Sequence, residues 1–219
     1  MAWMVFSTLK QKSKPSYSLE VQIIANDPLI RVVDNFFTNK ECNWIINKAR
    51  GKIKRAVVSS ASKGVESSGR TGSVAWFSHD DDPLLDSLTS RVAELADLPL
   101  EYSESLQVLH YGPEQHYRTH WDAYDLTTER GMRCCSDKGQ RIRTALAYLN
   151  DVPAGGHTKF PRLNVEVEPR MGRIVVFDNC IINSIDRHPD ALHAATPVIT
   201  GEKWAITLFF RDRPYKKSN

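Results

Sequence analysis

The hydrophobic period of the chain changes near residue 103, and this change constrains the fold more than any other feature of the sequence. From there on, the chain contains five short runs rich in Val, Ile, Leu and aromatic residues. Turn-forming stretches such as VPAGG and TGE separate them, a pattern typical of successive antiparallel β-strands. The runs are SESLQVLHY, RIRTALAYLND, RLNVEVEP, GRIVVFDN and KWAITLFFR.

The first half of the chain shows two helical patterns instead. Thr38, followed three residues later by Glu41, predicts a capping box that opens one amphipathic helix, and DPLLDSLTSRVAELADL predicts a second. Residues 59–73, rich in Ser and Gly, are predicted to form a long loop. Helices followed by strands predict an α+β fold, with a β-barrel or sandwich buttressed by N-terminal helices. The residues predicted to face inward from the helices are Trp44, Ile45, Ala49, Leu84, Leu88, Val92 and Leu95.

Length and composition describe an ordinary globular chain. With 219 residues, 41% hydrophobic and 25% charged, the chain is long enough for one sizeable core. We expect residues 1–18 to be a loose N-terminal extension and residues 19–219 to be a single domain. No apolar run approaches a membrane span, and a net charge of +3 is too small to indicate a nucleic-acid partner. Four cysteines without C-x-x-C spacing, and the lack of a convincing signal peptide, indicate free thiols in a cytoplasmic protein.

The stretch HYGPEQHYRTHWDAYD, residues 110–125, contains a candidate metal site. If it is extended, His120 and Asp122 point to one face and Trp121 to the other, because side chains two apart in a strand share a face. An imidazole beside a carboxylate makes up two thirds of the 2-His-1-carboxylate triad that holds non-haem Fe(II). An H-x-D pair alone is common, and a surface His and Asp is its more frequent explanation.

A second histidine strengthens the metal hypothesis. His193 lies in the apolar segment ALHAATPVITGEKWAITLFF, which also contains Lys203 at the start of its last strand. A lysine buried at the mouth of an apolar strand is costly unless it meets an anion. Ten residues beyond a ligand histidine and across a hairpin, Lys203 could hold the far carboxylate of a metal-bound acid. The predicted ligands are therefore His120, Asp122 and His193.

Five motifs, taken in order, resemble the Fe(II)- and 2-oxoglutarate-dependent dioxygenases of the prolyl 4-hydroxylase group. They are SGRTGS, ESLQVLHYGPEQHYRTHWD, QRIRTALAYLNDVPAGGHTKFP, GRIVVFDN and HAATPVITGEKW. The resemblance covers roughly residues 30–212 and implies a double-stranded β-helix, a distorted jelly roll, which agrees with the strand-rich second half. It also implies Fe(II) held by His120, Asp122 and His193, with Lys203 pairing with the C5 carboxylate of 2-oxoglutarate.

The resemblance implies further roles around this centre. Tyr111 and Thr158 match hydroxyl positions of the cosubstrate pocket, beside the single buried cation that a dianionic acid needs in an apolar barrel. The implied reaction uses O2 to hydroxylate peptidyl proline at C4, releases succinate and CO2, and is supported by ascorbate as a reductant of oxidised iron. The residues that would face the peptide substrate are Arg70, Glu104, Tyr117 and Arg141.

Four positions depart from the family pattern. Glu114 stands where the family usually has glycine, and His157 replaces the acidic residue of GGET. Phe209 and Arg211 occupy positions where collagen-type members carry tryptophan and another polar residue. These departures bear on the substrate, so the same chemistry on another residue or a small molecule stays an alternative. A non-catalytic module that binds metal and 2-oxoglutarate is less favoured, as is a nucleic-acid demethylase, and the sequence leaves the oligomeric state open.

Overall fold

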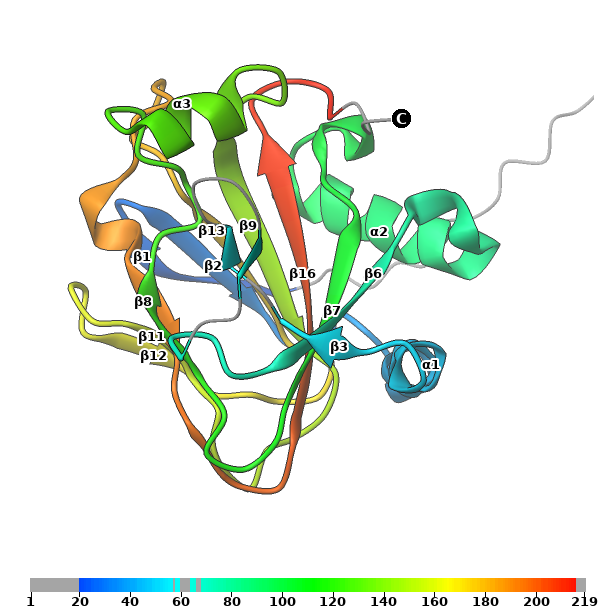
Figure 1. Ribbon diagram of the computed structural model, residues 1–219. Helices are drawn as coiled ribbons and strands as arrows, with labels where there is room; N and C mark the ends of the chain where they lie inside the picture. The colour runs from blue at the N-terminus through cyan, green and yellow to red at the C-terminus, as the bar shows by residue number, and fades with distance from the viewer. Residues whose placement is uncertain (1–19, 57, 60–63, 66–67, 216–219) are drawn as a thin grey trace, which may run out of the picture.

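Two facing β-sheets form the body of the molecule (Figure 1). The computed structural model describes residues 20–56, 58–59, 64–65 and 68–215, so the extension predicted for residues 1–18 lies outside the described residues. The larger sheet has eight strands in the order β1-β2-β13-β9-β16-β7-β6-β3, and the smaller has four in the order β12-β11-β14-β8. All paired neighbours run antiparallel. The predicted α+β fold with a double-stranded β-helix core is therefore confirmed.

The strands of the larger sheet are β1 (Val21–Asn26), β2 (Leu29–Val33), β3 (Lys54–Arg55), β6 (Ser73–Phe77), β7 (Leu106–Tyr111), β9 (Arg141–Tyr148), β13 (Ile174–Asp178) and β16 (Lys203–Arg211). Those of the smaller sheet are β8 (Tyr117–His120), β11 (Thr158–Phe160), β12 (Val165–Val167) and β14 (His193–Ala195). Two further pairs are β4 (Val58–Ser59) with β5 (Gly64–Val65), and β10 (Ala154–Gly155) with β15 (Val198–Thr200). The helices are α1 (Asn39–Arg50), α2 (Pro83–Ala96) and α3 (Glu129–Cys135), with 3-10 turns η1 (His79–Asp81), η2 (Leu100–Tyr102) and η3 (Pro189–Ala191).

Helices α1 and α2 pack on the outer face of the larger sheet (Figure 1). The capping box predicted for α1 is present, since Glu41 N donates to Thr38 Oγ1 and Thr38 N donates to the Glu41 carboxylate. In α2 the predicted inward residue Leu84 is wrong: it is 38% exposed, whereas Leu85 is 1% exposed. The buried stripe begins at Leu85 and continues with Leu88, so Leu84 at the second position of the helix is turned away from the sheet.

Strand β16 is buried along its whole length because both of its faces are covered. Its even-numbered residues, Trp204, Ile206, Leu208 and Phe210, belong to the core beneath the helices. Its odd-numbered residues face the space between the two sheets, where Lys203 and Phe209 line a cavity. The alternation of one strand therefore separates a packed apolar core from a functional interior.

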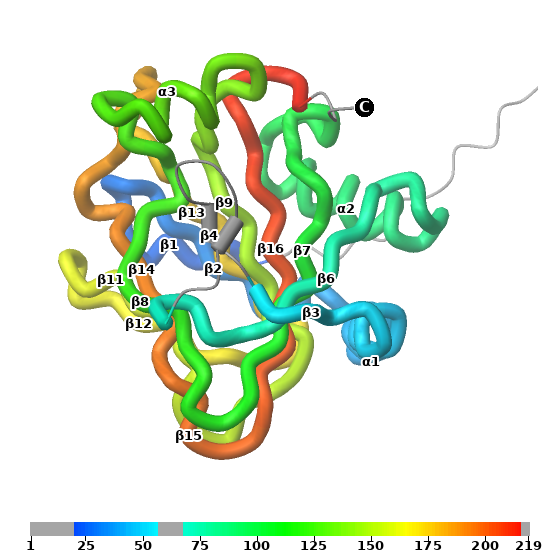
Figure 2. Tube along the Cα trace, in the orientation of Figure 1, coloured from blue at the N-terminus to red at the C-terminus, as the bar shows by residue number. Residues whose placement is uncertain are grey.

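The smaller sheet brings distant parts of the chain together. Strand β14 pairs with β8, and His193 lies directly opposite His120 in this pairing (Figure 2). Directly opposed residues of antiparallel strands have their side chains close together. The topology thus places the two predicted histidine ligands side by side.

Two local features differ from the sequence-based expectation. Part of the predicted loop 59–73 is a hairpin of β4 and β5, and Arg70 forms an isolated bridge with Tyr117; residues 60–63 and 66–67 lie outside the described residues. Glu114 has a φ of 64°, in the left-handed region that favours glycine. This explains why glycine is usual at that position in the family that the sequence resembles.

Two further findings concern the cysteines and the helices. All four cysteines are free thiols, as predicted. In the part of the chain that the structure describes, the helices lack the length and apolar character needed to cross a membrane.

Candidate active site

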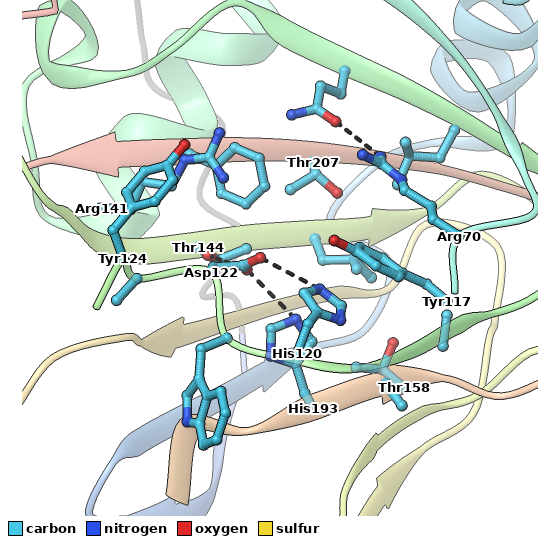
Figure 3. A pocket seen from close by; sticks show the side chains of 18 of the residues that line it. Arg70, Tyr117, His120, Asp122, Tyr124, Arg141, Thr144, Thr158, His193 and Thr207 are labelled. Atoms are coloured by element: carbon cyan, nitrogen blue, oxygen red, sulfur yellow. Dashed lines mark hydrogen bonds and ion pairs between the residues drawn. The ribbon is translucent and has the colours of Figure 1, made fainter. Parts of the chain in front are cut away.

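His120, Asp122 and His193 converge between the two sheets (Figure 3). Their ligand atoms all lie within 4.8 Å of one another. The Nε2 atoms of His120 and His193 lie 3.5 Å from Asp122 Oδ1 and Oδ2 respectively. Two imidazole nitrogens and one carboxylate that converge on one point fit the facial triad of a non-haem iron site.

The hydrogen bonds of the two histidines leave the metal-facing nitrogens free of protons. His120 Nδ1 lies 2.8 Å from the Arg118 carbonyl oxygen, and His193 Nδ1 lies 3.0 Å from that of Ala191. Because a carbonyl oxygen only accepts, each Nδ1–H must be the donor. Each Nε2 then keeps its lone pair for a cation, as expected for a histidine ligand held by an outer partner.

Asp122 is held as a carboxylate and oriented by a buried polar chain. Thr144 Oγ1 donates to Asp122 Oδ2 at 2.8 Å, and Asn179 Nδ2 donates to Thr144 Oγ1 at 2.8 Å. Burial alone would raise the pKa of Asp122, but His193 and His120 hold that pKa well below its usual range. Burial also lowers the pKa of His193 to about 4, so its imidazole is neutral near pH 7. The residues present therefore fit a divalent metal.

The reason why His120 and Asp122 converge differs from the prediction. Strand β8 ends at His120, so Asp122 does not follow the strand alternation. Trp121, which was predicted to face away, lines the same cavity, and its Nε1 donates to the Pro189 carbonyl oxygen at 3.0 Å. The predicted pair is correct, but a turn after the strand produces it.

Lys203 lies at one end of the cavity and is 2% exposed. Its Nζ donates to the Gly156 carbonyl oxygen at 2.6 Å, and among the described residues it forms no ion pair with a carboxylate. Burial lowers the pKa of Lys203 to about 7. Opposite it in the strand pairing is Tyr111, whose ring centroid lies 5.7 Å from Nζ. A cation buried in this way is well suited to bind an anionic ligand.

Thr158 and Tyr111, the two predicted hydroxyl residues, line this same end. Tyr148 lies behind Thr158, with its hydroxyl 2.7 Å from Thr158 Oγ1 and 3.1 Å from the Val167 carbonyl oxygen. The Tyr111 ring packs so closely on Gly72 that a Cβ added there would lie 2.6 Å from Cε1. The glycine of the RTGS motif is therefore required by the position of the tyrosine.

Arg70 and Tyr117 lie together near the metal ligands (Figure 3). The Tyr117 ring stacks on the His120 ring, with centroids 3.6 Å apart and planes at 19°. The Arg70 guanidinium lies 5.0 Å from the Tyr117 ring, and its Nη2 donates to Gln107 Oε1 at 3.2 Å. An aromatic ring is thus held beside the metal position by contacts with His120 and Arg70.

Arg141 lines the other end of the cavity, whereas Glu104 does not line it. Glu104 is 4% exposed and lies behind Arg141, which donates to it through Nε at 2.5 Å and Nη2 at 2.8 Å. Arg211 also donates to Glu104, through Nε at 2.9 Å. Two arginines therefore use the Glu104 carboxylate, and its contact with substrate stays a prediction.

The cavity that joins these parts has a volume of about 670 Å³. This is large enough for a small acid at the Lys203 end together with a side chain at the Arg141 end. The sequence analysis missed several polar residues that line or support it. The period-2 alternation of β9 and of β7 and β16 could have found most of them: Thr144, Tyr148, Gln107 and Thr207. Nothing in the sequence pattern singled out Tyr124.

Comparisons with known proteins agree with this geometry. Residues 106–211 match the 2OG-Fe(II) oxygenase superfamily. A prolyl 4-hydroxylase-like protein of Acanthamoeba polyphaga mimivirus is 34% identical over 84% of this chain and 74% of its own length. Prolyl 4-hydroxylase 5 of Arabidopsis thaliana is 31% identical over 90% of this chain and 72% of its own length.

A solved structure extends the match to the fold. The collagen prolyl hydroxylase of Paramecium Bursaria Chlorella virus-1, crystallised with 2-oxoglutarate, has a TM-score of 0.64 and 25% identity. The match covers 82% of this chain and 94% of the viral protein. The chain described here belongs to the prolyl 4-hydroxylase family of the 2OG-Fe(II) oxygenase superfamily and is a 2-oxoglutarate-dependent dioxygenase.

Proposed function

We propose that the protein hydroxylates peptidyl proline at C4, with 2-oxoglutarate as cosubstrate. The observation that carries this proposal is one cavity lined by Lys203, by the three triad residues and by Tyr117 and Arg141. When bound, Fe(II) and 2-oxoglutarate together supply the oxidation, in which O2 delivers one oxygen to a C–H bond and one to succinate as CO2 leaves. Everything else required of the site falls to residues of this chain.

The three ligand residues would hold the metal at one position. The carbonyl partners of His120 and His193 select the tautomer that exposes Nε2, and Thr144 holds one oxygen of Asp122. Three protein ligands leave coordination positions for other groups, which a purely structural metal site would not need.

Lys203 binds and orients the cosubstrate. Its charged form is disfavoured by burial, so a carboxylate that approaches Nζ gains a strong charge-assisted hydrogen bond. Thr158 can donate a second hydrogen bond when its own hydroxyl accepts from Tyr148, and Tyr111 closes the pocket on the opposite strand. These contacts hold the acid with its other end toward the metal.

The substrate end fits a proline residue. The Tyr117 ring stacks on the metal ligand His120 and lines the cavity, so an aromatic ring would lie beside a bound pyrrolidine ring. Arg70 and Arg141, on opposite sides of the triad, can donate hydrogen bonds to peptide carbonyl oxygens (Figure 3). A relative named prolyl 4-hydroxylase supports this substrate class.

The remaining proposals concern the setting of the reaction. We propose that residues 19–219 act as one catalytic domain, since residues from Arg70 to Lys203 line one cavity. Ascorbate is proposed as the reductant that restores Fe(II) after unproductive turnover. The partner is proposed to be a peptide rather than a nucleic acid or a membrane, because the net charge is only +3. Four free cysteines support a reducing cytoplasmic location.

The test combines two products. The Fe(II)-loaded protein is given 2-oxoglutarate, O2 and proline-containing peptides, with and without ascorbate; succinate and a mass gain of one oxygen on the peptide are then measured. We expect both products in equal amounts. Succinate without peptide oxidation would overturn the prolyl substrate while leaving the oxygenase chemistry in place.

A ligand variant tests the site itself. We expect His193→Ala to lose turnover by more than about 100-fold, beyond the loss typical of removing a residue that only supports a ligand. His116→Ala is the matched control, because the His116 ring is absent from the cavity lining and its Nδ1 lies 3.1 Å from the Glu114 carbonyl oxygen. Full turnover by His193→Ala would show that the triad is assigned wrongly.

A further inference from the structure

Tyr124 lies at the end of the cavity opposite Arg70 and is surrounded by positive charge (Figure 3). The guanidinium carbons of Arg141, Arg211 and Arg130 lie 5.3, 5.6 and 6.0 Å from its ring centroid. Each contact is within the range of a cation–π interaction. These four residues are called the Tyr124 cluster below.

The charge of the Tyr124 cluster is only partly compensated. Glu104 binds both Arg141 and Arg211, so one carboxylate serves two guanidiniums. Arg130 forms no ion pair with any carboxylate among the described residues, and its ring contact with Tyr124 leaves its charge uncompensated. Three guanidiniums and one carboxylate leave two net positive charges around a single ring.

Local structure holds Arg130 in place at the cavity. Arg130 is in the first turn of α3, where Thr128 Oγ1 accepts a hydrogen bond from Gly131 N at 3.0 Å. A Cβ added at Gly131 would lie 1.7 Å from the Asp125 carbonyl oxygen, so this turn packs tightly on the preceding loop. Arg130 itself is exposed and lines the cavity. Its guanidinium is therefore accessible to a bound molecule.

The rest of the cavity is close to neutral. Arg187 is paired with Asp125 at 3.1 Å, and the single charges of Lys203 and Asp122 cancel. The two charges of Fe(II) and of the 2-oxoglutarate dianion also cancel. The excess positive charge is therefore concentrated at the Tyr124 cluster, apart from Arg70 at the opposite end.

The Tyr124 cluster also has room beside it. Tyr124 and Arg141 line both the main cavity and a second cavity of about 270 Å³. The second cavity is also lined by the basic residues Arg133, Lys138 and Arg211 and by the acidic residues Glu104 and Asp137. A side chain that leaves the main cavity past Tyr124 would thus enter a polar, mainly basic space.

We propose that the Tyr124 cluster binds a carboxylate of the peptide substrate and makes this enzyme prefer a proline with an acidic group nearby. The proposal rests on the proposed prolyl hydroxylation and adds a substrate class to it. The carboxylate could belong to an Asp or Glu side chain or to the C-terminus of a short peptide. Both offer the planar pair of oxygens that a guanidinium binds with two hydrogen bonds.

The expected preference is moderate because Arg130 is exposed. Salt screens contacts between exposed charges. Such contacts change the association rate and the specificity of a complex more than its affinity. We expect an Asp-containing peptide to exceed its Asn counterpart by about 5- to 10-fold in kcat/KM at low ionic strength, as for a well-placed charge pair. The ratio should approach unity at high salt.

The test uses peptide pairs with proline at a fixed position and Asp or Asn placed at successive positions on either side. Both peptide ends are blocked, and a second set with a free C-terminus separates a side-chain carboxylate from a terminal one. Turnover is measured together with binding of the fluorescent peptides to the same protein by anisotropy without O2. We expect the preference to be confined to one side of the proline.

Arg130→Gln should reduce the Asp/Asn ratio in both measurements, and Arg130→Glu should reverse it. Arg170→Gln is the matched control, because it removes the same charge from a side chain that is 60% exposed and does not line the cavity. Equal binding and turnover of Asp and Asn peptides, or an equal effect of the two Gln variants, would overturn the proposal. Turnover of the neutral peptides would still support prolyl hydroxylation, so failure of one proposal is distinguishable from failure of the other.

Discussion

The two ends of the cavity hold buried positive charge in opposite ways. Lys203 Nζ donates to the Gly156 carbonyl oxygen and forms no ion pair with a carboxylate of the described residues, and burial lowers the pKa of Lys203 to about 7. Burial opposes the charge of Arg141 as well, but Glu104 more than offsets this and raises the pKa of Arg141 above its usual range. The charged form of Lys203 therefore needs an anionic ligand to stabilise it, whereas Glu104 already stabilises the charged form of Arg141 in the folded protein.

This difference assigns different tasks to the two cations. At Lys203 an incoming carboxylate replaces a weak partner and gains the most. At Arg141 the carboxylate of Glu104 is already in place, so the guanidinium is held rigidly and can position a substrate. Because Glu104 already pairs with Arg141, the attraction of a substrate carboxylate to that end comes mainly from exposed Arg130. This accounts for the modest, salt-dependent preference proposed above.

The largest expected effect is a loss of stability when the counter-ion of Arg141 is removed. Glu104→Gln should lower the free energy of unfolding by about 3–5 kcal/mol, because it leaves the buried guanidinium of Arg211 and the half-buried one of Arg141 without their counter-ion. Chemical denaturation monitored by circular dichroism measures this loss. Glu166→Gln is the control, since the Glu166 side chain is 43% exposed and its one ion pair within the described part of the chain is with His157, at 3.3 Å. A loss below about 1 kcal/mol would mean that Arg141 does not depend on Glu104.

At the Lys203 end of the cavity, Lys203→Met should weaken 2-oxoglutarate binding with little change in the stability of the protein. The KM for 2-oxoglutarate should rise by roughly 10- to 100-fold, because a charge-assisted hydrogen bond is lost. The free energy of unfolding should fall by no more than about 1 kcal/mol, since the loss of the hydrogen bond to Gly156 is offset by the removal of a buried charge. Lys159→Met, at an exposed lysine of β11, is the control. A large loss of stability with an unchanged KM would show that Lys203 stabilises the fold and does not bind 2-oxoglutarate.

The pH dependence of the two ends should also differ. Below pH 7 Lys203 is already charged, so the Kd for 2-oxoglutarate should be nearly constant. Above pH 7 the free protein must take up a proton to bind the dianion, and Kd should rise by up to about tenfold per pH unit. Calorimetry without O2, in buffers of different ionisation enthalpy, measures both Kd and proton uptake. Arg141 stays charged throughout, so peptide binding should show no such rise; a flat Kd for 2-oxoglutarate would exclude Lys203 as its titrating partner.

The smallest expected effect tests the hydroxyl groups of Tyr148 and Thr158 near Lys203. Tyr148→Phe removes the group that holds Thr158, so we expect the KM for 2-oxoglutarate to rise about 3-fold, in line with the loss of one neutral hydrogen bond. The value of kcat should stay unchanged, because Tyr148 does not line the cavity. Steady-state kinetics over a range of 2-oxoglutarate concentrations separates the two parameters. A change in kcat alone would indicate a role nearer the reaction than the structure assigns.

Much of the fold could be predicted from local patterns. The capping box at Thr38 and Glu41 starts α1, and the five apolar runs of the second half correspond to β7, β9, β12, β13 and β16. These features depend on residues close together in the chain, whose spacing alone sets the buried face. Leu84 shows the limit of this approach, because 84, 88, 92 and 95 and 85, 88, 92 and 96 are both helical stripes. Only the sheet beneath α2 selects one of them.

The sequence by itself determined which residues could form the iron and cosubstrate site: His120, Asp122, His193 and Lys203 were all predicted, and the structure brings the first three together. What only the tertiary structure decided is how the charges between the sheets are balanced. The pairing of Glu104 with Arg141 and Arg211, and the gathering of guanidiniums around Tyr124, join residues from separate elements. The physical reason is that a ligand motif can be recognised from its residue types and their spacing. The compensation of a buried charge depends instead on which distant side chains the fold places within a few ångströms of it.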